Sequence, residues 1–189
     1  MLAEQFTVIA PDLPGIRDSA IPRGGLGMKT AAIRIHALAR SLGVNKAEVV
    51  GHDIGLMVAY AYAAQFPAET EKLVVMDAFL RSVAEWEDVY NNPGVWHFRF
   101  NGPTPEAAYA RPGHMRAGWA YFVSFQQAAS DFAQLSQSRL PMPVLAIGGE
   151  KANGALLGQQ MKIVASDATM VVLKEHWTLG ARRKSKTDD

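Results

Sequence analysis

An aspartate flanked by two glycines is the most chemically suggestive feature of the sequence. In residues 49–67, VVGHDIGLMVAYAYAAQFP, a run rich in β-branched residues leads into GHDIG, and an almost wholly apolar segment follows. A sharp strand-to-helix turn that presents a nucleophile leaves room only for small residues two positions before and after it. Gly51 and Gly55 meet this requirement, whereas a plain helix N-cap role for Asp53 explains neither glycine. The pattern predicts that Asp53 is an exposed nucleophile.

A carboxylate nucleophile restricts the reactions that such a turn can perform. Aspartate, with a reference pKa of about 3.9, is ionised at neutral pH and needs no base to activate it. Its attack on an ester or amide gives a reactive anhydride, whereas its attack on an sp³ carbon with a strained or stable leaving group gives an ordinary alkyl ester. Small apolar epoxides and halogenated compounds are therefore the expected substrates. Water must then attack the carbonyl carbon of Asp53, and this step needs a general base.

His176 is the candidate for this base. It lies just after the predicted strand 169–173, where sheets of this kind gather their site residues. His52 is a poor rival because it neighbours the nucleophile and must point elsewhere. His36 and His114 are expected to pack against other residues or to be solvated.

A histidine base of this type needs a carboxylate that orients it. Asp77 ends the strand that follows the predicted apolar helix, and it is the favoured acid. Glu150, which follows the next strand, is the alternative.

Short apolar runs alternate with helical patterns along the chain, which is typical of a parallel sheet with crossover helices. The predicted strands are residues 6–10, 47–51, 73–77, 144–148 and 169–173. The fold class is therefore α/β.

Two helices are predicted around the aspartate turn. The first ends at a Gly43 C-cap and carries one apolar stripe, formed by Ala31, Ile35, Leu38 and Leu42. The second, residues 54–66, is apolar nearly all round, so we expect it to be buried and to end at Pro67.

The strand rhythm breaks between residues 79 and 140. Aromatic residues, Asn, Pro and Gly are frequent there, and a long helix over residues 115–137 is predicted to follow them. We expect a first part of the core in residues 1–78, a shortened helical lid in 79–140, a second part of the core in 141–177 and a polar tail in 178–189.

Composition excludes several classes of function. The formal net charge is +1, so no nucleic-acid partner is indicated. The sequence has no cysteine, which excludes disulfides and thiol nucleophiles. No apolar run has the roughly 18 residues of a membrane span, and the first residues do not resemble a signal peptide. We expect a cytoplasmic protein without metal or organic cofactor, although its natural N-terminus is expected to be missing. The sequence leaves the oligomeric state open.

The segments VIAPDLPGIRDSA, VVGHDIG, LVVMDAF, VWHFRF and LKEHW occur in the order found in the α/β-hydrolase superfamily. Over residues 2–177 the chain resembles the epoxide-hydrolase and haloalkane dehalogenase branch of that superfamily. The resemblance implies a parallel sheet with an inserted helical lid. It also implies hydrolysis of epoxides to diols through an ester on Asp53, with His176 and Asp77 activating water and the Ile54 N–H as oxyanion donor. The family places glycine before this histidine, and Glu175 stands there instead.

The lid of the resembling enzymes assists ring opening with two tyrosines or with a histidine and a tyrosine. His97 in VWHFRF matches the histidine. Tyr121 is the candidate tyrosine, but the expected register falls on Phe122, and a shift of one residue turns a helix by about 100°. Trp96, Phe98 and Phe122 are the expected substrate contacts.

Two alternatives to epoxide hydrolysis remain. A dehalogenase acting on haloalkanes or haloacids uses the same nucleophile. It is less favoured because Ile54 and Met57 stand where haloacid enzymes place arginines, and Ile54 also where haloalkane enzymes often place tryptophan. The first strands of the family and its His-Gly oxyanion motif are not found in the sequence. An inactive truncated remnant that binds partners or aggregates is therefore the second alternative.

Overall fold

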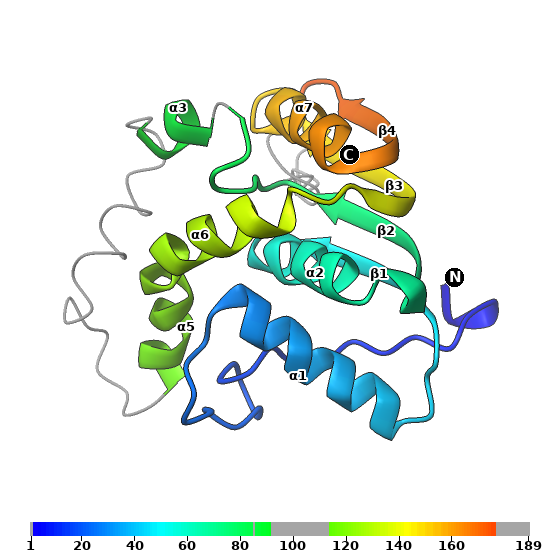
Figure 1. Ribbon diagram of the computed structural model, residues 1–189, viewed down its shortest axis with the longest axis vertical. Helices are drawn as coiled ribbons and strands as arrows, with labels where there is room; N and C mark the ends of the chain where they lie inside the picture. The colour runs from blue at the N-terminus through cyan, green and yellow to red at the C-terminus, as the bar shows by residue number, and fades with distance from the viewer. Residues whose placement is uncertain (1, 85, 92–113, 177–189) are drawn as a thin grey trace, which may run out of the picture.

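The computed structural model describes residues 2–84, 86–91 and 114–176, and in them four parallel strands form one sheet. The strand order is the order of the chain, β1-β2-β3-β4, as Figure 1 shows. The strands are β1 (Ala47–His52), β2 (Thr70–Met76), β3 (Leu140–Gly149) and β4 (Ala165–Leu173). All three pairings are parallel, so the carboxyl ends of the strands meet at one edge of the sheet.

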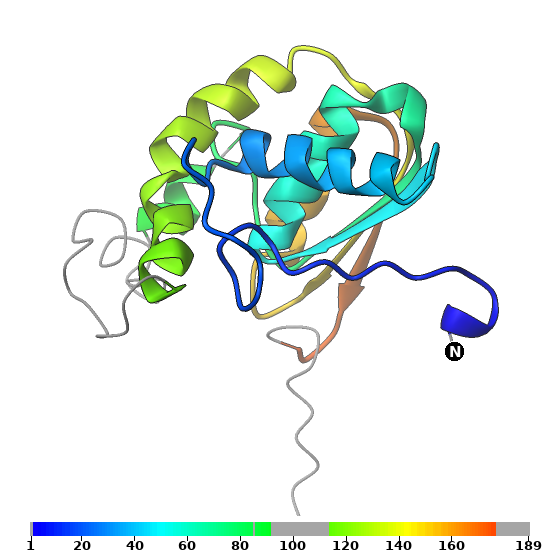
Figure 2. The ribbon, with the colours of Figure 1, turned by 90° about the horizontal axis from the view of Figure 1, so that it is seen from below.

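Three helices cover one face of this sheet: α1 (Met28–Ser41), α2 (Ile54–Gln65) and α7 (Gly154–Val164). Two short 3₁₀ helices, η1 (Leu2–Glu4) and η2 (Pro67–Glu69), precede α1 and follow α2. Between β2 and β3 the chain leaves the sheet for α3 (Trp86–Asn91), α5 (His114–Val123) and α6 (Phe125–Leu135). Figures 1 and 2 show α5 and α6 beside the helical layer at one end of the molecule. None of the described helices combines the length and the apolar character that crossing a membrane requires.

The core lies between the sheet and α2. Every residue from Leu56 to Ala63 is buried, which confirms the prediction of a helix that is apolar all round. α2 contacts α1, β1, β2 and α6, so each of its sides has a neighbour. Burial of this helix anchors the turn at its N-terminus, and this turn contains Asp53.

The opposite face of the sheet is open among the described residues. Strand register places Val50, Val74 and Leu145 side by side on this face, followed by a second row, Met76, Ile147 and Val171. Val50 is 61% exposed and Val171 is 39% exposed. Parallel sheets are usually covered on both faces, so one apolar side of this sheet has no cover in the described part of the chain.

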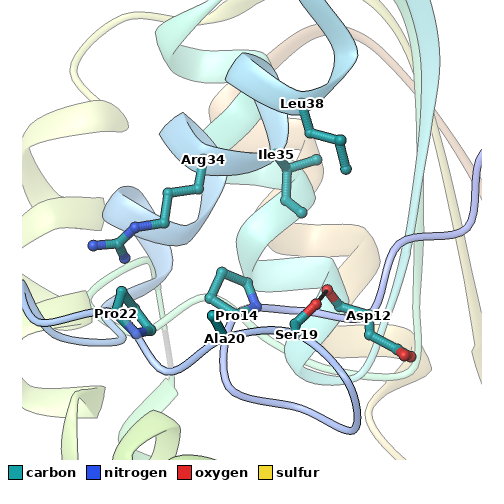
Figure 3. Close-up of a pocket in the computed structure, with 8 residues that line it drawn as sticks. All are labelled: Asp12, Pro14, Ser19, Ala20, Pro22, Arg34, Ile35 and Leu38. Atoms are coloured by element: carbon teal, nitrogen blue, oxygen red, sulfur yellow. Dashed lines mark hydrogen bonds between the residues drawn. The ribbon is translucent and has the colours of Figure 1, made fainter. Parts of the chain in front are cut away.

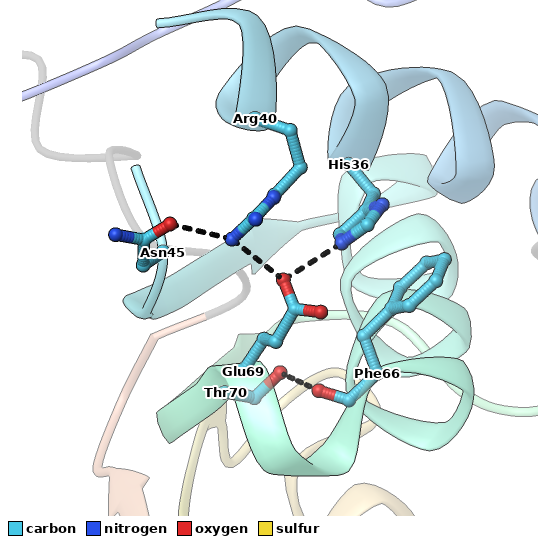
Figure 4. A network of polar contacts seen from close by, with 6 residues as sticks. All are labelled: His36, Arg40, Asn45, Phe66, Glu69 and Thr70. Atoms are coloured by element: carbon cyan, nitrogen blue, oxygen red, sulfur yellow. Dashed lines mark hydrogen bonds and ion pairs between the residues drawn. The ribbon is translucent and has the colours of Figure 1, made fainter. Parts of the chain in front are cut away.

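A polar cluster joins α1 to the turn between α2 and β2 (Figure 4). His36 Nε2 lies 2.9 Å from Glu69 Oε2, and the His36 ring stacks on Phe66 at a centroid distance of 3.7 Å. Arg40 Nη1 lies 3.7 Å from the same Glu69 oxygen and donates to Asn45 Oδ1 at 2.6 Å. His36 therefore packs and pairs between helices, in agreement with its predicted structural role.

The predicted strand at residues 6–10 is wrong. These residues form no ladder, and Phe6, Val8 and Ile9 are 49%, 54% and 41% exposed. The physical reason is the sheet itself: in the described structure β1 pairs with β2 on one side and offers its other edge to no strand. An apolar β-branched run without a ladder partner remains irregular.

The helix predicted over residues 115–137 is two helices. The first, α5, ends at Val123, and α6 begins at Phe125. Ser124 lies between them, and its hydroxyl donates to the Tyr121 carbonyl at 2.8 Å. A serine that bonds to the backbone of the preceding turn competes with helix continuation, so the axis changes direction here (Figure 1).

The predicted features of α1 are only partly correct. Gly43 has φ 79° just after the helix and donates to the Arg40 carbonyl, which confirms its C-cap role. Of the predicted apolar stripe, Ala31 is buried and Ile35 packs against the core. Leu38 and Leu42, in contrast, are 39% and 56% exposed.

Candidate active site at the carboxyl edge of the sheet

Asp53 occupies the turn between β1 and α2 in a strained backbone conformation. Its φ is 54° and its ψ is −124°, and the residue is exposed. A non-glycine residue at positive φ costs about 1–3 kcal/mol and persists only where its surroundings impose it. The Asp53 side chain makes no capping hydrogen bond to α2, so the N-cap interpretation does not describe this residue. Asp53 is thus an exposed residue at the tip of the turn, as a nucleophile requires.

The two glycines around Asp53 differ in what they accommodate. A Cβ atom on Gly51 would lie 2.7 Å from Ala59 Cβ and would also collide with the Gly55 backbone. The close approach of β1 and α2 therefore requires glycine at position 51, as predicted. A Cβ atom on Gly55 would meet nothing within 4 Å in the structure. The crowding predicted at Gly55 is not found, because no described element packs over that side of the turn.

Asp77 occupies the corresponding position after β2. Its side chain is only 1% exposed, and its Oδ1 accepts a hydrogen bond from the Gly149 N–H at 3.1 Å. Its Oδ2 lies 3.6 Å from Nε2 of His52. His52 therefore contacts the candidate acid. Sequence reasoning missed this contact, although the register that pairs His52 with Met76, the residue before Asp77, is the signal for it.

His176 follows β4, and its main chain is tied to the loop after β3. The Lys151 N–H donates to the His176 carbonyl at 3.0 Å, and the Glu175 N–H donates to the carboxylate of Glu150 at 3.1 Å. Glu175 has φ 63°, a left-handed conformation that favours glycine. The loop thus has glycine-like geometry although glutamate occupies the position. The structure shows no hydrogen bond or ion pair between the described side chains of His176 and Asp77.

Tyr121 lies in α5 with its hydroxyl turned to the N-terminal segment. The residue is 1% exposed, and its hydroxyl donates to the Pro14 carbonyl at 3.0 Å. Burial raises the pKa of Tyr121 to about 12, against a smaller opposing effect of Arg34. Because its proton is held by a backbone carbonyl, the described geometry gives no support to Tyr121 as a lid donor.

The other predicted lid residues divide into two groups. Phe122 is partly buried, and its ring lies 5.3 Å from that of Phe125. Trp96, His97 and Phe98 lie outside the described residues.

A cavity of about 280 Å³ lies between the N-terminal segment and α1 (Figure 3). It is lined by Asp12, Pro14, Ser19, Ala20, Pro22, Arg34, Ile35 and Leu38. Ser19 Oγ donates to the Asp12 carbonyl at 2.8 Å, so the wall is held by its own hydrogen bond. None of the predicted catalytic residues that the structure describes lines this cavity. The described residues also contain no group of three His, Asp or Glu side chains placed to hold a metal ion.

A parallel sheet, helices on one face and an aspartate in a tight strand-to-helix turn at the carboxyl edge are typical of an α/β hydrolase architecture. The family model described as alpha/beta hydrolase fold matches residues 1–160, and the chain belongs to this family.

Among curated proteins, the chain is similar to the soluble epoxide hydrolase of Corynebacterium sp. (strain C12), with 38% identity over 112 residues. This match covers 58% of the chain and 39% of the relative. An uncharacterized protein of Mycobacterium bovis is 38% identical over 77 residues, which are 41% of the chain and 23% of that protein. The chain thus spans less than half the length of these curated relatives.

Among solved structures, Cfl2 of Burkholderia cenocepacia superposes with a TM-score of 0.82 at 25% identity, covering 92% of this chain and 73% of Cfl2. The epoxide hydrolase CorEH superposes with a TM-score of 0.73 at 25% identity, covering 92% of this chain and 75% of CorEH. These similarities support the α/β hydrolase fold over nearly the whole chain.

Proposed function

We propose that the chain opens epoxides to diols through a covalent ester on Asp53. The observation that carries this proposal is the exposed residue Asp53, held at positive φ in the turn between β1 and α2. The similarity to a soluble epoxide hydrolase supports an epoxide as the substrate.

In the first step, an Asp53 carboxylate oxygen attacks a ring carbon of the epoxide. The ring C–O bond breaks, its electron pair remains on the oxygen, and this alkoxide takes a proton from a donor in the lid. By resemblance His97, outside the described residues, is the proposed donor. Tyr121 is not assigned this role, because its hydroxyl donates to Pro14.

In the second step, His176 accepts a proton from water, and the resulting hydroxide attacks the carbonyl carbon of the Asp53 ester. Negative charge develops on the ester carbonyl oxygen. The Ile54 N–H is the proposed donor to it, since Ile54 is the first residue of α2 and the first N–H groups of a helix lack intrahelical partners. Loss of one oxyanion donor typically raises the activation free energy by about 2.7–4 kcal/mol. Collapse of the intermediate breaks the alkyl ester bond, and the leaving alkoxide takes the proton from His176 to give the diol. Asp53 then loses its carboxyl proton, and the lid donor regains the proton that it gave in the first step.

Asp77 is the proposed orienting acid. Its carboxylate is almost fully buried and is fixed by the Gly149 N–H, so its orientation is well defined. The rival Glu150 is exposed, and its carboxylate already accepts the Glu175 N–H. The buried carboxylate is better suited to hold an imidazole in one tautomer.

Intact-mass and peptide mass spectrometry after brief exposure to a simple terminal epoxide tests the proposal. We expect an adduct of one epoxide mass on Asp53, none on Asp53→Ala, and a longer-lived adduct in His176→Gln and Asp77→Asn than in Glu150→Gln. A single turnover in ¹⁸O-water should label Asp53, because water attacks its carbonyl carbon.

Three outcomes would contradict the proposal. An adduct that persists in Asp53→Ala, or a monodisperse wild-type protein that forms none, removes Asp53 as the nucleophile. Halide release from a bromoalkane through an Asp53 adduct, without reaction of the epoxide, would instead identify a dehalogenase.

A further inference from the structure

Arg81 is a buried cation whose donors are only partly used. The residue is 6% exposed, and its Nε and Nη1 atoms have no hydrogen-bond partner in the described structure. A guanidinium carries five N–H donors and remains charged in proteins. A buried charge without a counter-charge is costly, so such groups are normally paired. An acceptor for these donors is therefore expected.

Aromatic rings surround this guanidinium. Its central carbon lies 4.4 Å from the centroid of the Trp86 ring, 4.4 Å from that of Tyr90 and 5.9 Å from that of Phe125. Trp86 and Tyr90 come from α3, and Phe125 begins α6. Cation–π contacts stabilise the charge, but ring faces do not replace the in-plane acceptors that the N–H groups require. The rings thus position the guanidinium and leave its Nε and Nη1 groups without an acceptor in the described structure.

Gln160 of α7 holds the loop that carries Arg81 through hydrogen bonds to its backbone. The Leu80 N–H donates to Gln160 Oε1 at 2.7 Å, and Gln160 Nε2 donates to the carbonyls of Leu80 and Val83. Gln160 itself is fully buried. Arg81 therefore extends from a segment held at both ends of its turn.

The charges around Arg81 favour a ligand with a single negative charge. Burial lowers the pKa of Arg81, whereas Tyr90 and Glu87 act in the opposite direction, Tyr90 also through a hydrogen bond. Glu87 is exposed, and it acts on Arg81 only as a nearby charge among the described residues. A monovalent anion would neutralise the guanidinium, while a dianion would add unbalanced charge beside Glu87.

We propose that Arg81, Trp86 and Tyr90 form a binding site for a small organic monocarboxylate. A carboxylate oxygen accepts a charge-assisted hydrogen bond from an unused N–H group and neutralises the guanidinium. The neighbouring rings favour an aromatic or apolar body on the ligand. This site does not depend on the Asp53 chemistry, and nothing in the proposed reaction uses it.

Isothermal titration of the full chain with benzoate at constant ionic strength tests the site. We expect saturable one-to-one binding of benzoate, and none of benzyl alcohol, which has the ring but no carboxylate. Arg81→Met and Arg81→Gln should each weaken binding at least tenfold. Arg17→Met removes a cation whose side chain is 77% exposed and should leave the affinity unchanged.

Three results would overturn the site: no saturable binding to the wild type, equal binding of chloride or phosphate, or unchanged affinity in a folded Arg81 variant. Thermal melting establishes that the variants are folded. Methionine is expected to be tolerated because it removes an unpaired buried charge. Asp53→Ala should bind benzoate like the wild type, so this result is independent of the result for the proposed hydrolysis.

Discussion

Asp53 and Asp77 leave neighbouring strands with the same positive φ. Both have φ 54°, and each N–H donates to the carbonyl of the adjacent strand at 3.1 Å, that of Asp53 to Met76 and that of Asp77 to Ile147. The hydrogen-bonded ladder thus continues one residue beyond each strand. It holds two strained aspartates at the same edge of the sheet, where the proposed nucleophile and acid are needed together.

The backbone strain at Asp53 should appear as a difference in the free energy of unfolding between two variants. Asp53→Gly removes the carboxylate and tolerates positive φ, whereas Asp53→Ala removes the carboxylate and keeps the penalty. We expect the glycine variant to be more stable by about 1 kcal/mol, the strain relieved less the entropy cost of glycine. Urea unfolding of the two variants measures this difference. An alanine variant as stable as the glycine variant would show that the turn is not strained.

Alanine substitution of the two glycines around Asp53 should have opposite effects. Gly51→Ala places a Cβ against Ala59 and the Gly55 backbone, and we expect a loss of about 1–3 kcal/mol. Gly55→Ala enters open space within α2 and should be neutral or stabilise by up to about 1 kcal/mol. Chemical denaturation compares them directly. A large loss in Gly55→Ala would mean that a further element packs there.

Replacing Tyr60 with phenylalanine should stabilise the protein. Its hydroxyl is buried without a hydrogen-bond partner in the described structure, while its ring packs edge-on to Phe132 at 5.5 Å. Tyr60→Phe keeps this ring contact and removes the unpaired group, so we expect a gain of about 1 kcal/mol. Tyr121→Phe is the matched control, and it should lose stability because Tyr121 donates to Pro14. Similar losses in both variants would contradict the assignment at Tyr60.

Tyr121 should also make the protein sensitive to alkaline pH. Burial raises its pKa from the ordinary value of 10.0 to about 12, so the hydroxyl is neutral in the folded state where the unfolded chain already ionises. The contribution of Tyr121 to the free energy of unfolding is complete below pH 10 and is lost as the pH rises towards 12. Tyr60 acts in the same direction, since burial raises its pKa as well. The free energy of unfolding should therefore fall less steeply with pH in the Tyr60→Phe/Tyr121→Phe double variant than in the wild type.

The sequence predicted the elements whose pattern is set locally. The uniformly apolar run of α2, the β-branched runs of β1 to β4 and the C-cap at Gly43 each depend on neighbouring residues, and the structure confirms them. Residues 6–10 show the limit of this reasoning. Their composition is that of a strand, but strand formation needs a partner that composition does not reveal.

In the candidate site, too, the sequence predicts the positions of single residues but not the contacts between distant ones. The position of Asp53 follows from GHDIG, and that of Asp77 from the end of its strand. The contact of His52 with Asp77 depends on register between strands, and the burial of Arg81 depends on α3, α6 and α7 together. Tyr121 shows the same limit, because a single residue of helical register decides whether its hydroxyl reaches a substrate or a backbone carbonyl.

The face of the sheet that the described residues leave uncovered has a thermodynamic consequence. Unfolding increases the heat capacity chiefly by exposing apolar surface to water, typically by about 12–15 cal/mol/K per residue. Val50 and Val171 on that face are exposed in the described structure, so unfolding adds little apolar exposure there. Calorimetry should accordingly give a smaller heat-capacity increment per residue than usual. The stability of this fold should vary only gently with temperature, with a broad maximum rather than a narrow one.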